Sequence, residues 1–391
     1  MKFSPNLKKW ILRILSYVLV AALASGVTML FFARSAKLSR VYNIISRCYI
    51  GDVDTVKMGD AAASAMIASL GDRWSYYIPA ARYDAYQEGK TNSYVGIGIT
   101  IIAREDGTGF DILQVEPGSS AQEAGIMPGD ILVEADGQTL AGMDVEGPAG
   151  IIKGERGTKV TVAVLRDGEK LTFEVTRRVV KTAVAKGKML PGNIGYIRIA
   201  NFNDNCAKQT IEHIDTLLEQ GATALVFDVR YNSGGYVTEM VEILDHLLPE
   251  GLLFQSERYN GQSLDYDSDA DCVELPMAVL VNADSYSAAE FFAAALSEYE
   301  WAVTVGQQTS GKSYFQNTFD LRDGSAIGLS VGKYLTPKGV SLAEAGGLTP
   351  DIQVDVDEQT AALIYAELAD PEEDPQLQAA VAALEEKGQN G

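Results

Sequence analysis

The stretch PMAVLVNADSYSAAEFFAAAL, residues 276–296, places an apolar strand, a polar turn and an alanine-rich helix in direct succession. A strand that leads into a helix through a short turn is the repeating unit of α/β proteins. Two serines, Ser285 and Ser287, lie in this turn, where a nucleophile at the head of a helix would be placed. Helix capping is the alternative interpretation of both hydroxyls.

The flanking segments repeat this pattern. The runs IGYIRIANF (194–202), ALVFDVR (224–230) and WAVTVGQ (301–307) have the composition of buried strands, and amphipathic helical patterns separate them. Alternating strands and helices favour parallel strands joined by helical crossovers. The sequence therefore predicts an α/β core on both sides of the opening stretch.

A segment rich in short strands and turns precedes this core. Residues 94–178 alternate short strands with Gly, Pro and Asp turns, including a hairpin that turns at Asp167 and Gly168. The segment VGIGI (95–99) begins this unit, and small residues there would let successive backbone N–H groups converge on a peptide carboxylate. A strand that merely begins with glycines is the alternative. The candidate carboxylate-binding residues are Gly96, Ile97, Gly98 and Ile99.

The N-terminus predicts a membrane segment. Four basic residues precede ILSYVLVAALASGVTMLFFA (14–33), which carries no charge. Twenty helical residues span roughly 30 Å, the thickness of a bilayer core. We expect an uncleaved signal anchor, with the rest of the chain outside the cytoplasm. Cleavage after ALA (22–24), which would release a secreted protein, is the alternative. The basic residues Arg34, Lys37 and Arg40 weaken the orientation argument.

Composition argues against two kinds of site: a nucleic-acid-binding surface and a metal or cofactor site. The 391 residues carry a net charge of −21, which disfavours binding to nucleic acid. Three widely spaced cysteines and two histidines form no metal-binding motif, so we expect no metal or other cofactor.

Domain boundaries follow from these patterns. We expect a cytoplasmic stub with the transmembrane anchor at 1–37, a helical region at 38–90, the β-rich unit at 91–180, the α/β core at 181–356 and an acidic helical tail at 357–391.

The histidines are weak candidates for a base, because His213 and His246 lie on amphipathic helices. A lysine can replace histidine where burial disfavours its charged form. Lys312, in VGQQTSGKSYFQ, is the candidate, and an ordinary surface lysine is the alternative. The turn RYNSGG (230–235) would expose backbone N–H groups at a helix start, or would simply be a tight turn.

Four motifs occur in a recognisable order: LVFDVRYNSGGYVTEMVEILDHLLPEG, VLVNADSYSAAEFFAAALSEY, VGQQTSGKSYFQ and YLTPKGVSL…GLTPDI. Together they resemble the carboxy-terminal processing proteases, the S41 family of serine peptidases. Residues 94–178 resemble a PDZ domain of the bacterial protease-associated type. The resemblance implies an α+β multidomain fold: helical N-terminal regions, a PDZ-like β domain, and an α/β core of the crotonase/ClpP-like ββα type.

The resemblance also implies roles for individual residues. Ser287, two residues before the family's Ala-Glu pair, would be the nucleophile, and Lys312, 25 residues later, its base. Gln316 would hold the lysine amine towards the serine. The oxyanion donors would be the backbone N–H of Ala288 and of one glycine of the NSGG turn, with Gly234 preferred over Gly235.

The sequence departs from the family pattern at three positions. Tyr286 and Ala289 replace a usual alanine and serine, and Ser233 stands where proline is common. These changes leave Ser287 and Lys312 in place. The resemblance therefore does not fix the conformation of the turn or the way in which substrate enters.

The sequence thus predicts a membrane-anchored, extracytoplasmic serine endopeptidase that cleaves proteins near or from their C-termini. The PDZ-like unit would bind substrate C-termini and gate the site. A homodimer and an activating partner are left open, as is cleavage of the anchor. Two alternatives are a catalytically inactive PDZ scaffold on a protease fold and a crotonase-like acyl-transfer enzyme.

Overall fold

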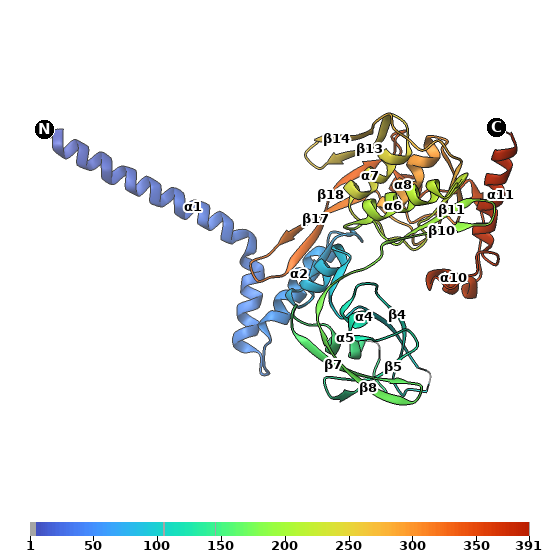
Figure 1. Cartoon of the computed structure of the whole chain (residues 1–391). Coiled ribbons are helices and arrows are strands. Elements are labelled where there is room, and N and C mark those ends of the chain that lie inside the picture. The colour runs from blue at the N-terminus through green and yellow to red at the C-terminus, as the bar shows by residue number, and fades with distance from the viewer. Residues whose placement is uncertain (1–4, 105, 145, 391) are drawn as a thin grey trace. The chain divides into compact units, whose positions relative to one another are not determined.

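The chain divides into two compact units, Met1–Arg73 and Trp74–Gly391. Figure 1 shows the helices and strands of both and labels many of them. The computed structural model describes residues 5–104, 106–144 and 146–390, with the backbone alone at 5–9, 11–12, 21, 24–36, 146 and 388–390.

The first unit consists of two helices, α1 (Pro5–Cys48) and α2 (Thr55–Ala68). Asp54 caps α2, since its carboxylate accepts hydrogen bonds from the N–H groups of Val56 and Lys57 at 3.1 and 3.0 Å. Within the described residues, no helix combines the length and apolar character needed to cross a membrane. In the predicted span 14–33, the structure does not describe the side chains of residues 21 and 24–33.

The PDZ-like unit is a small sheet in the strand order β3-β4-β5-β7-β8, with β6 paired to β5. Its interior is one apolar cluster that includes Ile97, Phe110, Leu132 and Val162, all at most 1% exposed. The elements are β2 (Ser93–Gly96), β3 (Ile99–Ala103), β4 (Phe110–Val115), α4 (Ser120–Ala124), β5 (Ile131–Ala135), β6 (Gln138–Thr139), α5 (Glu146–Ile152), β7 (Lys159–Arg166), β8 (Glu169–Thr176) and β9 (Arg178–Lys181).

The predicted hairpin of this unit is confirmed. Arg166 pairs with Glu169 across a two-residue loop, in which Asp167 and Gly168 have φ of 53° and 82°. Positive φ at both positions defines the turn whose twist matches that of the flanking strands. A local Asp-Gly signal was therefore sufficient to locate this turn.

The α/β core contains a six-stranded sheet in the order β10-β11-β12-β15-β16-β19. The strands from β11 to β19 are parallel, as predicted, and β10 is antiparallel to β11. The elements are β10 (Ala185–Leu190), β11 (Ile194–Ile199), α6 (Cys206–Glu219), β12 (Ala224–Asp228), α7 (Val237–Leu247), β15 (Met277–Val281), α8 (Ala288–Glu298), β16 (Ala302–Gly306) and β19 (Ile352–Gln353).

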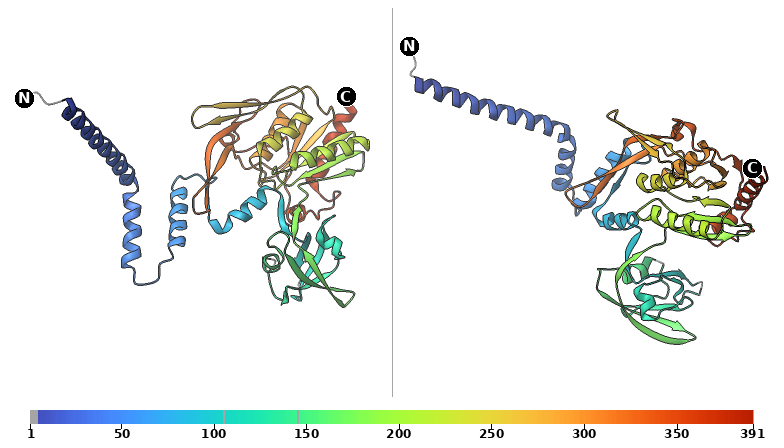
Figure 2. Two further views of the ribbon diagram at one scale, coloured as in Figure 1. Left: turned by 60° about the vertical axis from the view of Figure 1, so that its left-hand side comes forward. Right: turned by 45° about the horizontal axis from the view of Figure 1, so that its top comes forward.

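Both faces of this sheet are covered by helices. Alternate residues of β12 and β15 point in opposite directions, so Phe227 and Val279 join the apolar cluster beneath α6, α7 and α8. Val226 and Leu280 join a second cluster, which contains Leu377 of α11 (Pro375–Asn390). Figure 2 shows α11 on the side of the sheet away from α7 and α8. This double coverage explains why the central strands read as continuous apolar runs.

A second sheet lies beside the first and contributes to the candidate site. It has the order β1-β18-β13-β14, and β17 pairs with β18. Residues 74–90, assigned from sequence to the helical N-terminal region, belong to this second unit, since β1 pairs with Ala326–Gly328 of β18. The elements are β1 (Tyr76–Ile78), α3 (Ala80–Lys90), β13 (Gly251–Arg258), β14 (Ser263–Ser268), β17 (Tyr314–Asp320), β18 (Ala326–Leu335) and α9 (Leu342–Ala345).

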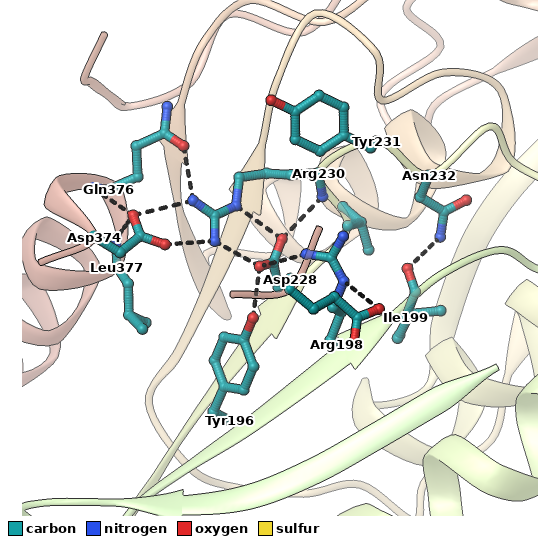
Figure 3. A network of polar contacts seen from close by, with 12 residues as sticks. Tyr196, Arg198, Ile199, Asp228, Arg230, Tyr231, Asn232, Asp374, Gln376 and Leu377 are labelled. Carbon is teal, nitrogen blue, oxygen red and sulfur yellow. Dashed lines mark hydrogen bonds and ion pairs between the residues drawn. The ribbon is translucent and has the colours of Figure 1, made fainter. Parts of the chain in front are cut away.

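The C-terminal tail, with α10 (Glu358–Tyr365) and α11, is joined to the core by a buried ion-pair network (Figure 3). Arg230, at the end of β12, donates from Nη2 to Asp228 at 2.6 Å and to Asp374 at 2.7 Å. Its Nη1 also donates to Gln376, at 2.9 Å. All four side chains are at most 4% exposed. The tail therefore supplies, through Asp374, a second counterion for the buried guanidinium of Arg230.

The Asp228 carboxylate of this network stays charged at neutral pH. Burial by itself would raise the pKa of Asp228, but the Arg230 guanidinium and the hydrogen bonds to the carboxylate outweigh it and lower the pKa to about 2. Because the folded-state pKa lies below the ordinary value of 3.8, the contribution of Asp228 to stability is present above that value. It is lost only as pH falls towards 2.

We predict that Asp374→Ala destabilises the protein, because it removes one carboxylate from a buried guanidinium. The expected loss is about 3 kcal/mol in the free energy of unfolding. Urea denaturation at pH 7 measures it. The matched control is Asp370→Ala, because this exposed carboxylate accepts from the nearby N–H of Glu372 and is not bonded to Arg230. Equal stability of the two variants would show that the network does not hold the tail.

Candidate active site

The turn between β15 and α8 holds the two candidate serines in different environments. Ser285 is fully buried, and its hydroxyl donates to the carbonyl of Val229 at 2.7 Å and accepts from the N–H of Asn282 at 3.0 Å. These bonds give Ser285 a structural role. Ser287 is half-buried and lines a cavity of about 580 Å³.

The backbone of Ser287 is strained. Its φ of +59° and ψ of −126° lie in a region that residues with a Cβ rarely adopt. Such a conformation costs about 1–3 kcal/mol and persists only where the surroundings impose it. Here the N–H of Ser287 donates to the Glu290 carboxylate at 2.9 Å, and the N–H of Tyr286 donates to the carbonyl of Asn232 at 3.1 Å. On the C-terminal side, the Ser287 carbonyl accepts from the N–H groups of Glu290 and Phe291 at 2.9 and 3.1 Å, so the strained residue is held from both sides.

Lys312 lines the same cavity as Ser287, from the loop between β16 and β17. Its Nζ lies 4.7 Å from the centre of the Trp74 ring and 5.6 Å from that of Tyr286. These two rings are themselves in contact, with centroids 5.7 Å apart. An ammonium is attracted to such ring faces. The tyrosine that departs from the family pattern is thus part of the lysine's surroundings.

Gln316, on β17, also faces this cavity. Its amide nitrogen donates to the carbonyl of Tyr314 at 2.9 Å and to the hydroxyl of Ser330 at 3.1 Å. The side chain is thereby fixed to the β17–β18 pair. The structure thus brings three predicted residues, Ser287, Lys312 and Gln316, to one cavity.

The NSGG turn lies directly against the Ser287 turn. A Cβ added at Gly234 would come within 2.8 Å of the Ser287 Cβ and 3.0 Å of the Ala288 nitrogen. Both turns follow the C-terminal ends of neighbouring parallel strands, the edge at which such sheets assemble their sites. The hydrogen bond from Tyr231 N–H to the Asn282 side chain, at 2.9 Å, joins the two turns.

The two glycines of this turn differ in what their backbones do. The N–H of Gly234 donates to the Asn232 side chain at 2.8 Å, and its carbonyl accepts from Phe202 at 2.9 Å. Gly234 is buried, whereas Gly235 is partly exposed and lines the cavity. The geometry does not favour the predicted preference for Gly234, because its N–H is already used within the turn.

The histidines lie away from this cavity. His246 of α7 is 3.2 Å from the carboxylate of Asp215 on α6, and the ring of His213 packs near Gly187 of β10. Neither histidine lines the cavity that contains Ser287.

The predicted carboxylate loop, residues 96–99, connects β2 with β3 in the PDZ-like unit. The Ile97 carbonyl accepts from Ala121 N–H and the Gly98 carbonyl from Glu116 N–H, both at 2.9 Å. Gly98 has a φ of +86° and packs against Ser119, where a Cβ would approach to 2.4 Å. The loop is thus anchored through its carbonyls beside β3, an end strand of its sheet.

Comparisons with known proteins agree with this architecture. Residues 193–354 match the model of peptidase family S41, and residues 112–166 match a PDZ domain. The chain is 32% identical to the carboxy-terminal processing protease CtpA of Bacillus subtilis over 325 residues, 82% of this chain and 69% of that protein. It is 32% identical to the chloroplastic carboxyl-terminal-processing peptidase 2 of Arabidopsis thaliana over 305 residues, 74% of this chain and 59% of that one.

A solved S41 protease from Bacteroides fragilis shares the fold, with a TM-score of 0.54 at 17% identity over 88% of this chain and 93% of that one. The chain belongs to peptidase family S41, the serine-type peptidases that include the carboxy-terminal processing proteases. The sequence-based assignment to this family is confirmed, and the protein is a serine-type peptidase with a PDZ domain.

Sequence reasoning missed one residue at the centre of this geometry. Glu290 is fully buried at the third position of α8. The only sequence signal is a carboxylate three residues after a serine, the spacing of a helix capping box. Its contacts with the loop that carries Lys312 could not be inferred from that spacing.

Proposed function

We propose that the protein is an endopeptidase that cleaves protein substrates near or from their C-termini through a Ser287–Lys312 dyad. The main support is that both side chains line one cavity, with Ser287 strained at the head of a buried helix. Membership of family S41 supports the same chemistry. A lysine base also agrees with the positions of the two histidines, which do not line this cavity.

In the proposed mechanism, neutral Lys312 accepts the hydroxyl proton of Ser287 as the oxygen attacks the scissile carbonyl. The oxyanion accepts hydrogen bonds from the N–H groups of Ala288 and Gly235. Lys312 then returns the proton to the leaving amine. Water then gives a proton to Lys312 and attacks the acyl-enzyme. The ester bond breaks, the new carboxyl terminus leaves, and Lys312 returns the proton to the Ser287 oxygen, which restores the serine and the neutral amine. Gln316 orients the amine.

The choice of Gly235 as the second oxyanion donor rests on two observations. Its neighbour Gly234 already donates to Asn232, and Gly235 is the one that lines the cavity. A side chain at Gly235 would come within 2.3 Å of the Phe202 backbone, so a glycine is required at this position.

We predict that Ser287→Ala and Lys312→Ala each lower kcat by about 10³-fold or more, because each removes one member of a unit that acts together. The measurement is hydrolysis of a peptide with a free C-terminus, together with labelling of Ser287 by a fluorophosphonate. Lys338→Ala, a change at an exposed lysine, is the matched control and should retain activity.

The same assay distinguishes the inactive-scaffold alternative. A wild-type protein that binds peptide but neither hydrolyses it nor reacts with the fluorophosphonate would be a scaffold. Substantial activity in Lys312→Ala would instead contradict the lysine base.

We further propose that the PDZ-like unit captures substrate C-termini and gates the active site. A peptide would add as a strand beside β3, with its carboxylate at residues 96–99. The support is the position of β3 at the end of its sheet and the anchored loop beside it.

Amidation of a substrate's C-terminus should therefore raise KM by about tenfold or more, since it removes a charged hydrogen-bonding group. N-terminal acetylation of the same peptide is the control and should leave KM unchanged. Gating predicts that a non-cleavable peptide acid, added in trans, raises kcat whereas its amide does not. Equal KM for acid and amide would count against carboxylate capture.

Finally, we propose that the uncharged run at 14–33, part of whose side chains lie outside the described structure, anchors the protein in a cell membrane with the catalytic part outside the cytoplasm. The support is the uncharged run at 14–33 and the exposed apolar side chains of α1, including Leu15, Val18, Leu19 and Leu23. Release as a secreted protein, after cleavage of this segment, is the alternative.

The full chain should accordingly stay with membranes after alkaline carbonate extraction, because an apolar helix in the bilayer is not removed by high pH. A variant that lacks residues 1–37 should be soluble. Recovery of the intact full chain in the soluble fraction would contradict the anchor, and recovery of a shortened chain outside the cell would indicate cleavage.

A further inference from the structure

The carboxylate of Glu290 joins the two loops that carry the proposed dyad. One of its oxygens, Oε2, accepts from the backbone N–H of Ser287 at 2.9 Å and from the backbone N–H of Lys312 at 2.8 Å. A single buried atom is therefore hydrogen-bonded to both residues. This atom connects two residues that lie on different loops and 25 positions apart in the chain.

The second oxygen, Oε1, binds the same loop further upstream. It accepts from the N–H of Gly311 at 2.7 Å and from the hydroxyl of Thr309. Thr309 is in turn fixed to the following segment, because its hydroxyl accepts from the N–H of Leu348 at 2.7 Å. The carboxylate thus holds the Lys312 loop at three successive points.

The chemistry of the site requires a carboxylate. Four donors point at two oxygens, and an ionised carboxylate presents acceptors only. A glutamine of the same shape would direct its own N–H groups at some of these donors. Burial of a charged group is unfavourable unless hydrogen bonds compensate it, and Glu290 is fully buried. Its four charge-assisted hydrogen bonds supply that compensation.

The bond to Ser287 also acts on the strained backbone. Glu290 stands at the third position of α8 and reaches back to the N–H of the residue that precedes the helix. This bond fixes the peptide unit that leads into Ser287 in its unusual conformation. The same atom therefore determines the direction of the serine and the position of the lysine loop.

We propose that Glu290 is a positioning residue that sets the separation of Ser287 and Lys312, an inference that rests on the proposed dyad. Glu290 is not among the residues that line the cavity of Ser287 and Lys312. It acts through the backbone of the two residues that do. Misplacement of reacting groups by about 1 Å lowers rates by about 10²-fold, so its loss affects the chemical step and not substrate binding.

The experiment compares Glu290→Gln with two matched controls. Glu298→Gln changes a carboxylate on the same helix that accepts from Thr336 and from Lys338 N–H, away from the dyad. Thr309→Val removes a buried donor of the Glu290 network but leaves the Oε2 bonds to Ser287 and Lys312 in place. Each variant is assayed as the full chain with a peptide substrate and a fluorophosphonate.

We expect Glu290→Gln to lower kcat and the rate of fluorophosphonate labelling by about 10²-fold, with KM unchanged within about threefold. Its pH–rate profile should differ from that of the wild type, because the base is displaced from the serine. Glu298→Gln should retain the wild-type kcat and profile. Thr309→Val should lose thermal stability but keep the wild-type pH profile.

The outcomes separate the two proposals. If the wild type neither hydrolyses peptide nor labels at Ser287, the dyad itself fails. If the wild type is active and Glu290→Gln keeps its kcat and pH profile, only the positioning role is overturned. A kcat loss that merely follows thermal stability across Glu290→Gln and Thr309→Val would also overturn it, in favour of a purely structural role.

Glu290→Asp provides a second variant should Glu290→Gln fail to fold. The carboxylate is kept but is one methylene shorter, so it cannot reach Ser287 and Lys312 together. The same reduction in kcat at unchanged KM is expected, and a wild-type kcat in this variant would overturn the proposal.

Discussion

One oxygen atom, Glu290 Oε2, accepts hydrogen bonds from the loop after β15 and from the loop after β16. The remaining geometry of the candidate site depends on this connection. Neighbouring parallel strands bring the loops to one edge of the sheet, but strands alone fix them only approximately. A buried carboxylate with four donors converts that approximate proximity into a defined separation. The strained, positive-φ conformation of Ser287 can persist because this carboxylate accepts from its N–H.

The sheet that carries these loops is stabilised from both faces, and its two faces use different parts of the chain. Helices α6, α7 and α8 cover one face, while α11 covers the other. The sequence presents the tail as acidic and alanine-rich, yet Leu377, Ala380 and Leu384 of α11 are at most 3% exposed. Small residues let this helix pack closely on the strands. The tail is therefore part of the core and not an appendage to it.

Much of this architecture could be predicted from the sequence, because local patterns determine it. Apolar runs between amphipathic helices indicated the parallel sheet, and Asp167-Gly168 located a hairpin. The order of the four family-like motifs located Ser287 and Lys312, which share one cavity. The rest depends on tertiary contacts. The choice between Gly234 and Gly235 rests on where the Asn232 side chain points, and the role of Glu290 rests on a loop 22 residues away.

The ion pair between Arg230 and Asp374 joins residues that are 144 positions apart in the chain. A chain is made from its N-terminus, so the sheet and both turns of the site are synthesised well before the carboxylate that neutralises Arg230. Until Asp374 emerges, a guanidinium beside the NSGG turn lacks one of its counterions, and the second face of the sheet is bare. Assembly of the candidate site is therefore complete only after Asp374 and the helix that follows it have been synthesised, which places its maturation after that of the strands that carry the two turns.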